Sequence, residues 1–255
     1  MEKRFVGKVA LVTGATNGIG QAAAVRLAAE GALVGVNQRP SGDPGETLRR
    51  IEKAGGEGFP VVADMRDPAQ VVAMVRETAR RGGRLDYVVS NAAINPFMTW
   101  DKTSLEDFDR LSETNFRGTW VVCSEGAKQM IKEKHGGAIV MVSSISAHVG
   151  APEQVVYCGT KGAISMLGKA LGSVLGSHGI RVNVIEPGAV RSNMSAPMFD
   201  HPEILKYYNE RIALHRVGEP EELAAAIAFM LSDDASYITS ATLLVDAGFI
   251  VNAEM

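Results

Sequence analysis

The sequence predicts an α/β fold, a single domain in which a doubly wound sheet of seven parallel strands is flanked by helices. Short apolar runs bounded by glycine or polar residues alternate with longer segments whose apolar residues recur at helical spacing. The length of 255 residues, 46% of them hydrophobic, allows one domain near the upper size for a single core. No period of about 20–50 residues repeats, so we expect residues 1–255 to form one unit.

Composition argues against several classes of partner. The net charge is −3 and the isoelectric point about 6.0, and lysine and arginine are scattered, which gives no electrostatic case for nucleic acid or an anionic membrane. The amino terminus passes directly into a predicted strand and no apolar stretch approaches ~18 residues, so we expect neither an export signal nor a membrane span. Cys123 and Cys158 lie in predicted helices without metal-ligand spacing, which predicts buried free thiols. These features indicate a cytoplasmic protein that acts on a small molecule.

The first strand and helix enclose a glycine-rich turn. Residues 9–12 form a short apolar run, residues 21–30 have helical spacing, and Thr-Gly-Ala-Thr-Asn-Gly-Ile-Gly lies between them at 13–20. The three glycines let the backbone approach a pyrophosphate, whose charge then meets the free N–H groups of the helix. A tight turn that needs glycine only for its dihedral angles is the alternative. The position between a strand and a helix favours a dinucleotide site.

The end of the second strand predicts which dinucleotide binds. Residues 32–36 form the strand, and Asn37, Gln38 and Arg39 follow it. An acidic residue at this point accepts hydrogen bonds from the ribose 2′-hydroxyl of NAD, whereas an arginine suits the 2′-phosphate of NADP. Asp43 lies in a loop that the sequence does not place. We therefore predict NADP as the preferred cofactor and NAD as a second one, with a solvated surface arginine as the alternative.

The next three elements place one acidic residue at the same edge of the sheet. A helix at about 45–54, a strand at 58–62 and a helix at about 68–80 follow one another. Asp64 comes directly after the strand. It would either bond the adenine edge of a dinucleotide or cap the turn before the following helix.

The fourth strand and the long helix after it supply two asparagines. The strand at 85–89 leads into Asn91, which is expected at the carboxyl edge of the sheet. The helix predicted for 104–134 has Ser104 as its cap. Asn115 lies inside this helix although asparagine is a poor helix former, so it either bonds locally or is retained for a site.

A tyrosine and a lysine follow the fifth strand. The strand at 138–142 ends beside Ser144, and ligands bind at the carboxyl ends of parallel strands. In the helix predicted for 155–177, Tyr157 and Lys161 are four residues apart and project from one face. Lowering a phenol's pKa by ~2 takes roughly 3 kcal/mol, which a partly desolvated lysine supplies. Chance gives roughly 0.2 such pairs per chain, so the pair by itself is weak evidence.

The last third of the chain completes the sheet. A strand at 180–185 ends in Glu-Pro-Gly-Ala-Val-Arg-Ser at 186–192, and a helix at 220–231 precedes the last strand at 241–245. The segment 192–215 between them contains prolines and several aromatic residues. Such a segment between the sheet and the last helix predicts a lid over the substrate.

These motifs together resemble the classical subfamily of short-chain dehydrogenases/reductases over essentially the full length. Residues 13–20 are similar to the family's T-G-x-x-x-G-I-G turn, Ser-Asn-Ala-Ala at 90–93 stands where N-N-A-G is usual, and 187–190 resembles P-G-x-V. The interval from Ser144 to Tyr157 is the customary one (157 − 144 = 13). The resemblance implies a Rossmann-like fold, NADP or NAD as cofactor, and a homotetramer with contacts through the helices around 104–134 and 155–177.

The resemblance also implies roles for individual residues and no metal. The implied catalytic residues are Asn115, Ser144, Tyr157 and Lys161. The implied cofactor-binding residues are Gly14, Thr16, Asn17, Gly18, Ile19, Gly20, Gln38, Arg39, Asp64, Met65, Asn91, Ala92, Tyr157, Lys161, Pro187, Gly188, Val190 and Ser192. Tyr157 as phenolate would accept the substrate's proton while Ser144 bonds the same oxygen. Lys161 would lower the phenol's pKa and bond the nicotinamide ribose, and Asn115 would hold a water that relays the proton.

Four positions depart from the family pattern. Ala93 and Ala247 replace glycines, Ser90 replaces an asparagine and Ser192 replaces a threonine. Since alanine does not favour positive φ, we expect an ordinary φ at Ala93 and a local backbone that differs from the family's. Ser192 keeps a hydroxyl and the role that goes with it.

A narrower resemblance predicts the substrate class. Within the family, the chain is most similar to sugar 1-dehydrogenases, notably those that act on L-rhamnose. The similarity lies in segments 90–97, 143–147 and 243–252 and in Gln154. The implied reaction oxidises C1 of an aldose to a lactone, and the polar groups expected around the sugar are Ser144, Ser146, His148, Gln154, Tyr157 and Asn95. Reduction of a 3-oxoacyl thioester or a keto-steroid by the same residues is one alternative. A non-catalytic NADP-binding regulator on this fold is the other.

Overall fold

The predicted parallel sheet is confirmed in the computed structural model, which describes residues 3–252. Its strands pair in the order β3-β2-β1-β4-β5-β6-β7, each pair parallel. They are β1 (Val9–Val12), β2 (Leu33–Gln38), β3 (Glu57–Val62), β4 (Tyr87–Ser90), β5 (Gly137–Val142), β6 (Ile180–Pro187) and β7 (Thr242–Val245). The central strands read as continuous apolar runs because both of their faces are buried.

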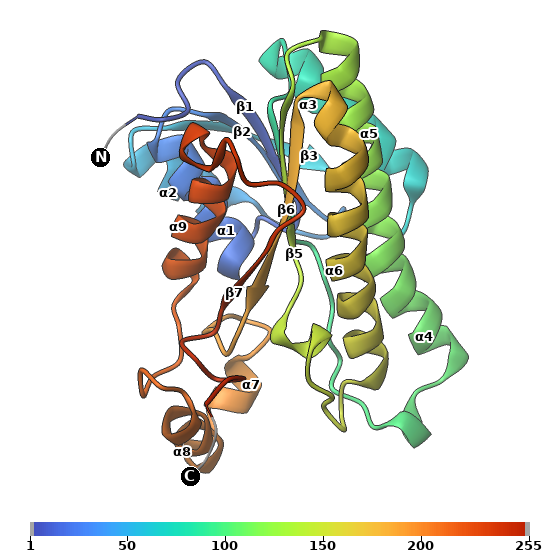
Figure 1. Ribbon diagram of the computed structural model, residues 1–255, viewed down its shortest axis with the longest axis vertical. Helices are drawn as coiled ribbons and strands as arrows, with labels where there is room; N and C mark the ends of the chain where they lie inside the picture. The colour runs from blue at the N-terminus through green and yellow to red at the C-terminus, as the bar shows by residue number, and fades with distance from the viewer. Residues whose placement is uncertain (1–2, 253–255) are drawn as a thin grey trace.

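Helices cover both faces of the sheet, which makes the molecule a three-layer α/β sandwich (Figure 1). One face packs against α1 (Gly18–Ala29), α2 (Gly45–Lys53) and α9 (Pro220–Leu231). The other packs against α3 (Pro68–Gly82), α5 (Gly118–Glu133) and α6 (Val155–Leu175). The remaining helices are α4 (Leu105–Leu111), α7 (Ala196–Phe199) and α8 (Pro202–Arg211), with short turns η1 (Trp100–Lys102), η2 (Ser112–Arg117), η3 (Ile145–Ala147), η4 (Gly176–His178) and η5 (Asp233–Ala235).

The direction in which the sheet grows reverses between β1 and β4. Strand β1 pairs with β2 on one side and with β4 on the other. The loops after these two strands therefore diverge to opposite faces and leave a crevice, which is where open parallel sheets bind ligands. The two loops are tied together there, because the Thr13 hydroxyl accepts hydrogen bonds from the backbone N–H of Asn91 at 2.9 Å and of Ala92 at 3.1 Å.

The prediction of a single helix over 104–134 is wrong in one respect. Ser104 caps it as predicted, with a reciprocal hydrogen bond to Asp107. However, the helix is divided into α4 and α5 by the π-helical turn η2, which contains Asn115. A π turn accommodates an extra residue in the helix and turns the following side chains, so it can direct the buried Asn115 toward the sheet edge.

The segment predicted to be a lid forms α7 and α8, which lie beyond the carboxyl ends of the strands (Figure 1). Phe199, Ile212 and Val217 form a small core of their own beneath it. The carboxyl-terminal segment closes this core, since the Phe249 ring stacks on Tyr208 with centroids 5.4 Å apart. This part of the chain thus has a small apolar core of its own, separate from those of the sheet.

The structure also bears on the predictions that the two cysteines are buried free thiols and that no segment spans a membrane. Cys123 is buried and unpaired, as predicted. Cys158 is also unpaired but only half-buried, because the helical rotation from Tyr157 turns it away from the core. Among the described residues, no helix combines the length and apolar character needed to cross a membrane.

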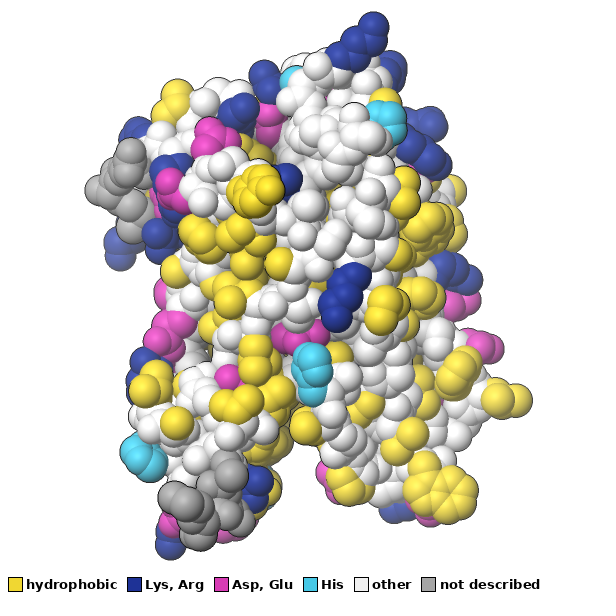
Figure 2. All heavy atoms as spheres, viewed as in Figure 1, with side chains coloured by type: hydrophobic (Ala, Val, Ile, Leu, Met, Phe, Trp, Pro, Cys, Tyr) yellow, Lys and Arg dark blue, Asp and Glu magenta, His cyan; other side chains and the backbone are white. Residues whose placement is uncertain are grey.

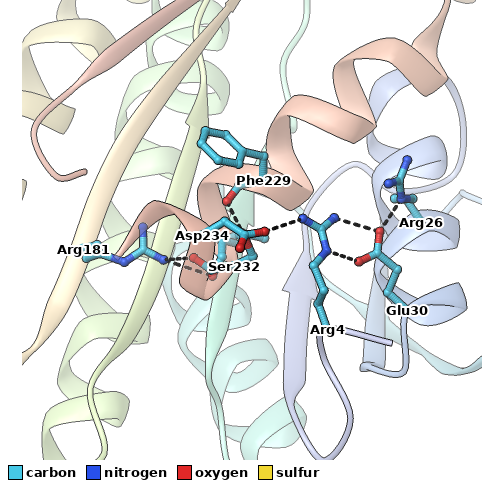
Figure 3. Close-up of polar contacts among 8 residues, drawn as sticks. Arg4, Arg26, Glu30, Arg181, Phe229, Ser232 and Asp234 are labelled. Atoms are coloured by element: carbon cyan, nitrogen blue, oxygen red, sulfur yellow. Dashed lines mark hydrogen bonds and ion pairs between the residues drawn. The ribbon is translucent and has the colours of Figure 1, made fainter. Parts of the chain in front are cut away.

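Arginines hold the amino-terminal end of the chain and the end of α9 (Figure 3). Arg4 donates to the buried Glu30 carboxylate at 2.6 and 2.9 Å, and Arg26 pairs with the same group. Burial alone would raise the pKa of Glu30, but the hydrogen bonds from both arginines outweigh it and lower that pKa. Arg181 on β6 donates to the Leu231 carbonyl at 3.0 Å and so meets the negative end of α9.

The two alanines that stand at family glycine positions behave differently. Ala93 is not among the described residues with positive φ, as expected. Ala247 is one of them, with φ +53°. The unusual backbone is therefore at Ala247, after β7, and not at Ala93.

The end of α5 offers a test of local stability. Lys134 follows this helix with φ +60° and an exposed side chain. The left-handed region costs a non-glycine residue about 1–2 kcal/mol, whereas glycine loses ~0.5–1 kcal/mol of chain entropy. We expect Lys134→Gly to raise the free energy of unfolding by ~0.5–1 kcal/mol in a denaturant titration. The control Lys128→Gly, at an exposed position inside α5, should lower it by about 1 kcal/mol; a decrease in both variants would contradict the assignment.

Candidate active site

A cavity of about 620 Å³ opens at the carboxyl ends of the strands. It runs from the glycine turn after β1, past the loop after β4, to Tyr157 and Lys161 on α6. Figure 2 shows a hollow at the lower edge of the molecule, between the α7–α8 part and the lower end of α6. The volume is in the range of small-molecule and cofactor sites.

The glycine turn has the shape of a cradle for phosphate. Gly14 and Gly18 adopt φ +61° and +54°, which other residues rarely do. A Cβ on Gly20 would lie 2.4 Å from the Gly14 carbonyl oxygen, so this glycine is required by close packing. It does not line the cavity, whereas the other predicted residues of the turn do.

Asn37 and Thr13, which were not predicted as site residues, support this turn together with Asn91. The Asn37 side chain accepts a hydrogen bond from the Gly14 N–H at 3.1 Å, and the Asn91 side chain donates to the Gly14 carbonyl at 3.2 Å. The Thr13 hydroxyl joins the turn to the loop after β4, as described above. A polar side chain directly after a buried strand was the only available signal for Asn37 and Thr13.

The opposite end of the cavity carries charged groups. It is lined by the residues predicted to meet the adenosine of the cofactor, Gln38, Arg39, Asp64 and Met65. Asp64 pairs with Arg66 at 2.8 Å; this hydrogen bond lowers the Asp64 pKa despite partial burial, and the nearby charge of Arg39 adds to the effect. Asp64 caps the turn before α3, because its carboxylate accepts from the Arg66 backbone N–H at 2.9 Å. The cap of α3 itself is Asp67, whose carboxylate accepts from two backbone N–H groups.

The predicted phenol and amine lie together, buried, on α6. The Lys161 Nζ is 5.4 Å from the centre of the Tyr157 ring and donates to the Val142 carbonyl at 2.9 Å. Ser144, at the end of β5, faces the same cavity. The helix presents both side chains on one face because they are four residues apart.

Burial governs the titration of this pair. Burial raises the pKa of Tyr157 to about 12, although the hydrogen bond with Ser144 partly opposes this increase. It also lowers the pKa of Lys161 to about 7. The expectation that the lysine charge dominates the phenol's pKa therefore needs correction, because desolvation disfavours the charged form of both groups.

Asn115 is buried and does not line the cavity. Its amide oxygen accepts from the Ile94 N–H at 2.8 Å, and its amide nitrogen donates to the Ile94 carbonyl at 3.0 Å and to Thr160 at 3.3 Å. The side chain is thus engaged in holding the loop after β4 against α6.

Most of the predicted substrate contacts surround the same end of the cavity. Ser146 donates to the Gln154 side-chain oxygen at 3.2 Å, and Ser144 donates to Ser146 at 3.2 Å. Asn95 also lines the cavity, with a buried side-chain oxygen that has no protein partner in the described chain.

His148 does not belong to this group. It is absent from the cavity wall, and its Nε2 contacts the Glu186 carboxylate at 2.5 Å. The turn η3 directs it toward β6, so His148 stands apart from the other residues that were predicted to contact the substrate.

The remaining wall combines positions far apart in the sequence. Pro187, Gly188, Val190 and Ser192 line it after β6, as predicted. The wall also contains residues that were not predicted from the sequence: Phe97, Arg110, Thr114, Met194, Met198, Phe199 and Tyr208. The aromatic content of 192–215 was the one signal that pointed to some of them.

Comparison with known proteins agrees with this geometry. The family model described as enoyl-(acyl carrier protein) reductase matches residues 14–250. An L-rhamnose 1-dehydrogenase (NAD(P)(+)) of Sphingomonas sp. (strain SKA58) is 38% identical over 253 residues, 99% of this chain and 100% of that protein. The L-rhamnose 1-dehydrogenase (NADP(+)) of Thermoplasma acidophilum is 33% identical over 98% of this chain and 99% of its own.

A solved structure extends the comparison to the whole fold. The crystal structure of a short-chain type dehydrogenase/reductase from Mycobacterium marinum has a TM-score of 0.91 and 32% identity, and the match covers 96% of both chains. Sheet order, glycine turn and the Ser144, Tyr157 and Lys161 constellation all agree with this relationship. The chain belongs to the short-chain dehydrogenase/reductase family.

Proposed function

We propose that the protein is an NADP-dependent sugar 1-dehydrogenase, able to use NAD as well, that oxidises C1 of an aldose such as L-rhamnose to the lactone. One observation carries this proposal: Ser144, Tyr157 and Lys161 stand at one end of a cavity whose other end holds the glycine turn and Arg39. The names of the two sugar dehydrogenases similar over nearly the full chain support the choice of substrate.

The cavity fits a dinucleotide. The cradle formed by Gly14 and Gly18 would be narrowed by any side chain, since a Cβ at Gly14 would lie 2.9 Å from the Ala92 backbone. The phosphates would lie on this turn and the amino-terminal end of α1, with Asp64 and Met65 near the adenine and Arg39 near the 2′-phosphate. The residues from Pro187 to Ser192 would contact the nicotinamide, which when bound supplies the acceptor for hydride.

Tyr157 would act as the base in the oxidation. Its phenolate oxygen accepts the proton of the C1 hydroxyl, and the Ser144 hydroxyl donates to the same oxygen and holds it in place. Lys161 would hold the ribose next to the nicotinamide. Asn115 would keep the loop after β4 in position through its bonds to Ile94, and a water nearby would relay the proton outward.

The titration of the Tyr157–Lys161 pair suits this role. One proton lost from the pair leaves either a phenol beside an amine or a phenolate beside an ammonium, and these forms differ only in where the remaining proton lies. Burial favours the phenol, and the contact with Ser144 shifts the balance toward the phenolate. Since burial brings the pKa of Lys161 to about 7, the pair that has lost one proton becomes the main form as pH rises above that value, and the reactive phenolate form is the part of it that carries the remaining proton on Lys161.

Ser146, Gln154 and Asn95 would bind the hydroxyls of the sugar. They line the cavity beside Ser144, and a sugar ring needs a partner for each hydroxyl that it buries. Residues 192–215 would form the lid: Met194, Met198 and Tyr208 reach the cavity from this segment.

Two further properties follow from the same proposal. We expect a homotetramer, because apolar side chains are exposed along the flank formed by η1 and α4–α6 (Figure 2): Trp100, Leu105, Phe108, Trp120, Val155, Met166 and Val174. We expect the protein to work in the cytoplasm, because Cys123 and Cys158 are unpaired.

A panel of aldoses with NADP and with NAD tests the proposal. We expect sugar-dependent formation of reduced nicotinamide with L-rhamnose or a related aldose, faster with NADP, and a lactone as product. The Tyr157→Phe variant serves as the control for background reduction. If no aldose reacts while a 3-oxoacyl thioester or a keto-steroid is reduced, the proposed substrate is wrong.

A further inference from the structure

A buried carboxylate lies between the segments that carry the catalytic groups. Glu186 is the next-to-last residue of β6, and its side chain is 1% exposed. One carboxylate oxygen is 2.5 Å from the His148 Nε2 and the other is 2.5 Å from the Ser165 hydroxyl on α6. The proposed mechanism uses none of these three residues.

The Ser165 hydroxyl continues the contact into the site. It lies 2.9 Å from the Ser143 hydroxyl, which donates to the Lys161 carbonyl at 2.8 Å. Ser143 directly precedes Ser144, and Lys161 is one turn from Tyr157 on α6. A chain of hydrogen bonds therefore runs from the half-exposed His148 through the buried Glu186, Ser165 and Ser143 to the Lys161 carbonyl.

His148 and Glu186 share one hydrogen in their contact, and which of them donates it depends on the tautomer of the imidazole. Ser143 donates its hydroxyl hydrogen to the Lys161 carbonyl, so the single Ser165 hydrogen can serve only one of its two close oxygens. In every arrangement of these hydrogens, the imidazole nitrogen is bonded to the Glu186 side chain.

A contribution to stability alone does not account for this arrangement. Removing a carboxylate from water costs several kcal/mol. A protein in which well-packed apolar residues replace a buried charged pair is often as stable as the original protein or more stable. The His148 side chain is 47% exposed, so packing does not require an imidazole there. The polar pair is therefore better explained by what it positions.

We propose that His148 and Glu186 form a clamp that positions Ser144 relative to the nicotinamide-facing turn at Pro187 and Gly188. His148 ends the short turn η3 that begins at Ser144, so fixing its side chain fixes the far end of that turn. Glu186 immediately precedes Pro187 on β6. Through this contact, the loop after β5 and the loop after β6 keep one relative placement, which matters because a misplacement of ~1 Å can cost roughly 100-fold in rate. The clamp rests on the proposed function only in that both concern the same site.

Substitutions at His148 separate the hydrogen bond from the bulk of the side chain. His148→Leu removes the hydrogen-bonding nitrogen, whereas His148→Gln keeps an amide that can bond Glu186. With the substrate that the wild type turns over fastest, we expect His148→Leu to lower kcat about 10-fold while the KM for NADP changes less than about 2-fold. His148→Gln should recover most of kcat. The control His178→Leu, at an exposed histidine in η4, should leave both constants unchanged.

A double-mutant cycle and hydrogen exchange complete the test. In a Glu186→Leu background, which removes both hydrogen bonds of the carboxylate, His148→Leu should cost clearly less than 10-fold, because the clamp is already broken. Amides of 145–149 and 188–190 should exchange faster in His148→Leu than in wild type, with the core strands unchanged, and this readout does not depend on the substrate. Full kcat and unchanged exchange in His148→Leu, or equal losses in the Leu and Gln variants, would overturn the clamp. Failure of the proposed function would appear separately, as a fastest substrate that is not an aldose.

Discussion

Replacing Tyr157 by phenylalanine should lower kcat for sugar oxidation by roughly 1,000-fold, the usual contribution of a positioned acid or base. The substitution removes one oxygen from a side chain that is 9% exposed, so the packing of α6 against the sheet remains. The reaction then lacks the group that accepts the hydroxyl proton. Steady-state rates with the best aldose and NADP measure the effect.

Two comparisons make this result specific. Tyr237→Phe makes the same chemical change at a fully exposed tyrosine and should leave kcat unchanged. Binding of NADPH, followed by its fluorescence, should persist in Tyr157→Phe. In the wild type, the oxidation rate should increase as pH rises through about 7, where the Tyr157–Lys161 pair loses one proton, and the variant should lose this increase. A Tyr157→Phe enzyme that keeps near-normal turnover would exclude Tyr157 as the base.

Arg39→Ala should lower kcat/KM for NADP by ~30–100-fold while that for NAD changes less than about 3-fold. A hydrogen-bonded ion pair with phosphate is stronger than a neutral hydrogen bond, and NAD has no 2′-phosphate to form it. Arg39 is exposed at the cavity edge, so the substitution should not affect folding. Arg49→Ala, on the exposed face of α2, is the matched control. Equal effects on the two cofactors would show that Arg39 does not read the 2′-phosphate.

The parts of the site that could be predicted from the sequence are those that depend on the spacing of residues within one short segment. The glycine turn, Arg39 after β2 and the Tyr157–Lys161 pair on one helical face follow from strand ends and from the period of a helix, which short segments express by themselves. Asn115 shows the limit. Its poor helix propensity marked it as unusual, but the π turn and the bonds to Ile94 depend on a loop 21 residues away.

His148 illustrates a second limit. Its position between Ser144 and Tyr157 suggested a contact with substrate, yet its ring reaches a carboxylate 38 residues further along the chain. Which way a loop side chain points depends on the neighbouring strand, and the sequence does not list spatial neighbours. The same reason explains why Phe97, Arg110 and Tyr208 were missed: they come from three separate segments that meet only at the cavity.

By itself, the sequence determined the alternation of strands and helices, the parallel sheet and most of the residues that line the glycine-turn end of the cavity, because apolar periodicity and glycine placement are properties of neighbouring residues. Only the tertiary structure decided how the cavity is walled, that burial moves the pKa of Tyr157 and of Lys161 in opposite directions, and that Glu186 joins the loops after β5 and β6. These properties arise from desolvation and from contacts between distant segments, and both exist only after the sheet has brought those segments together.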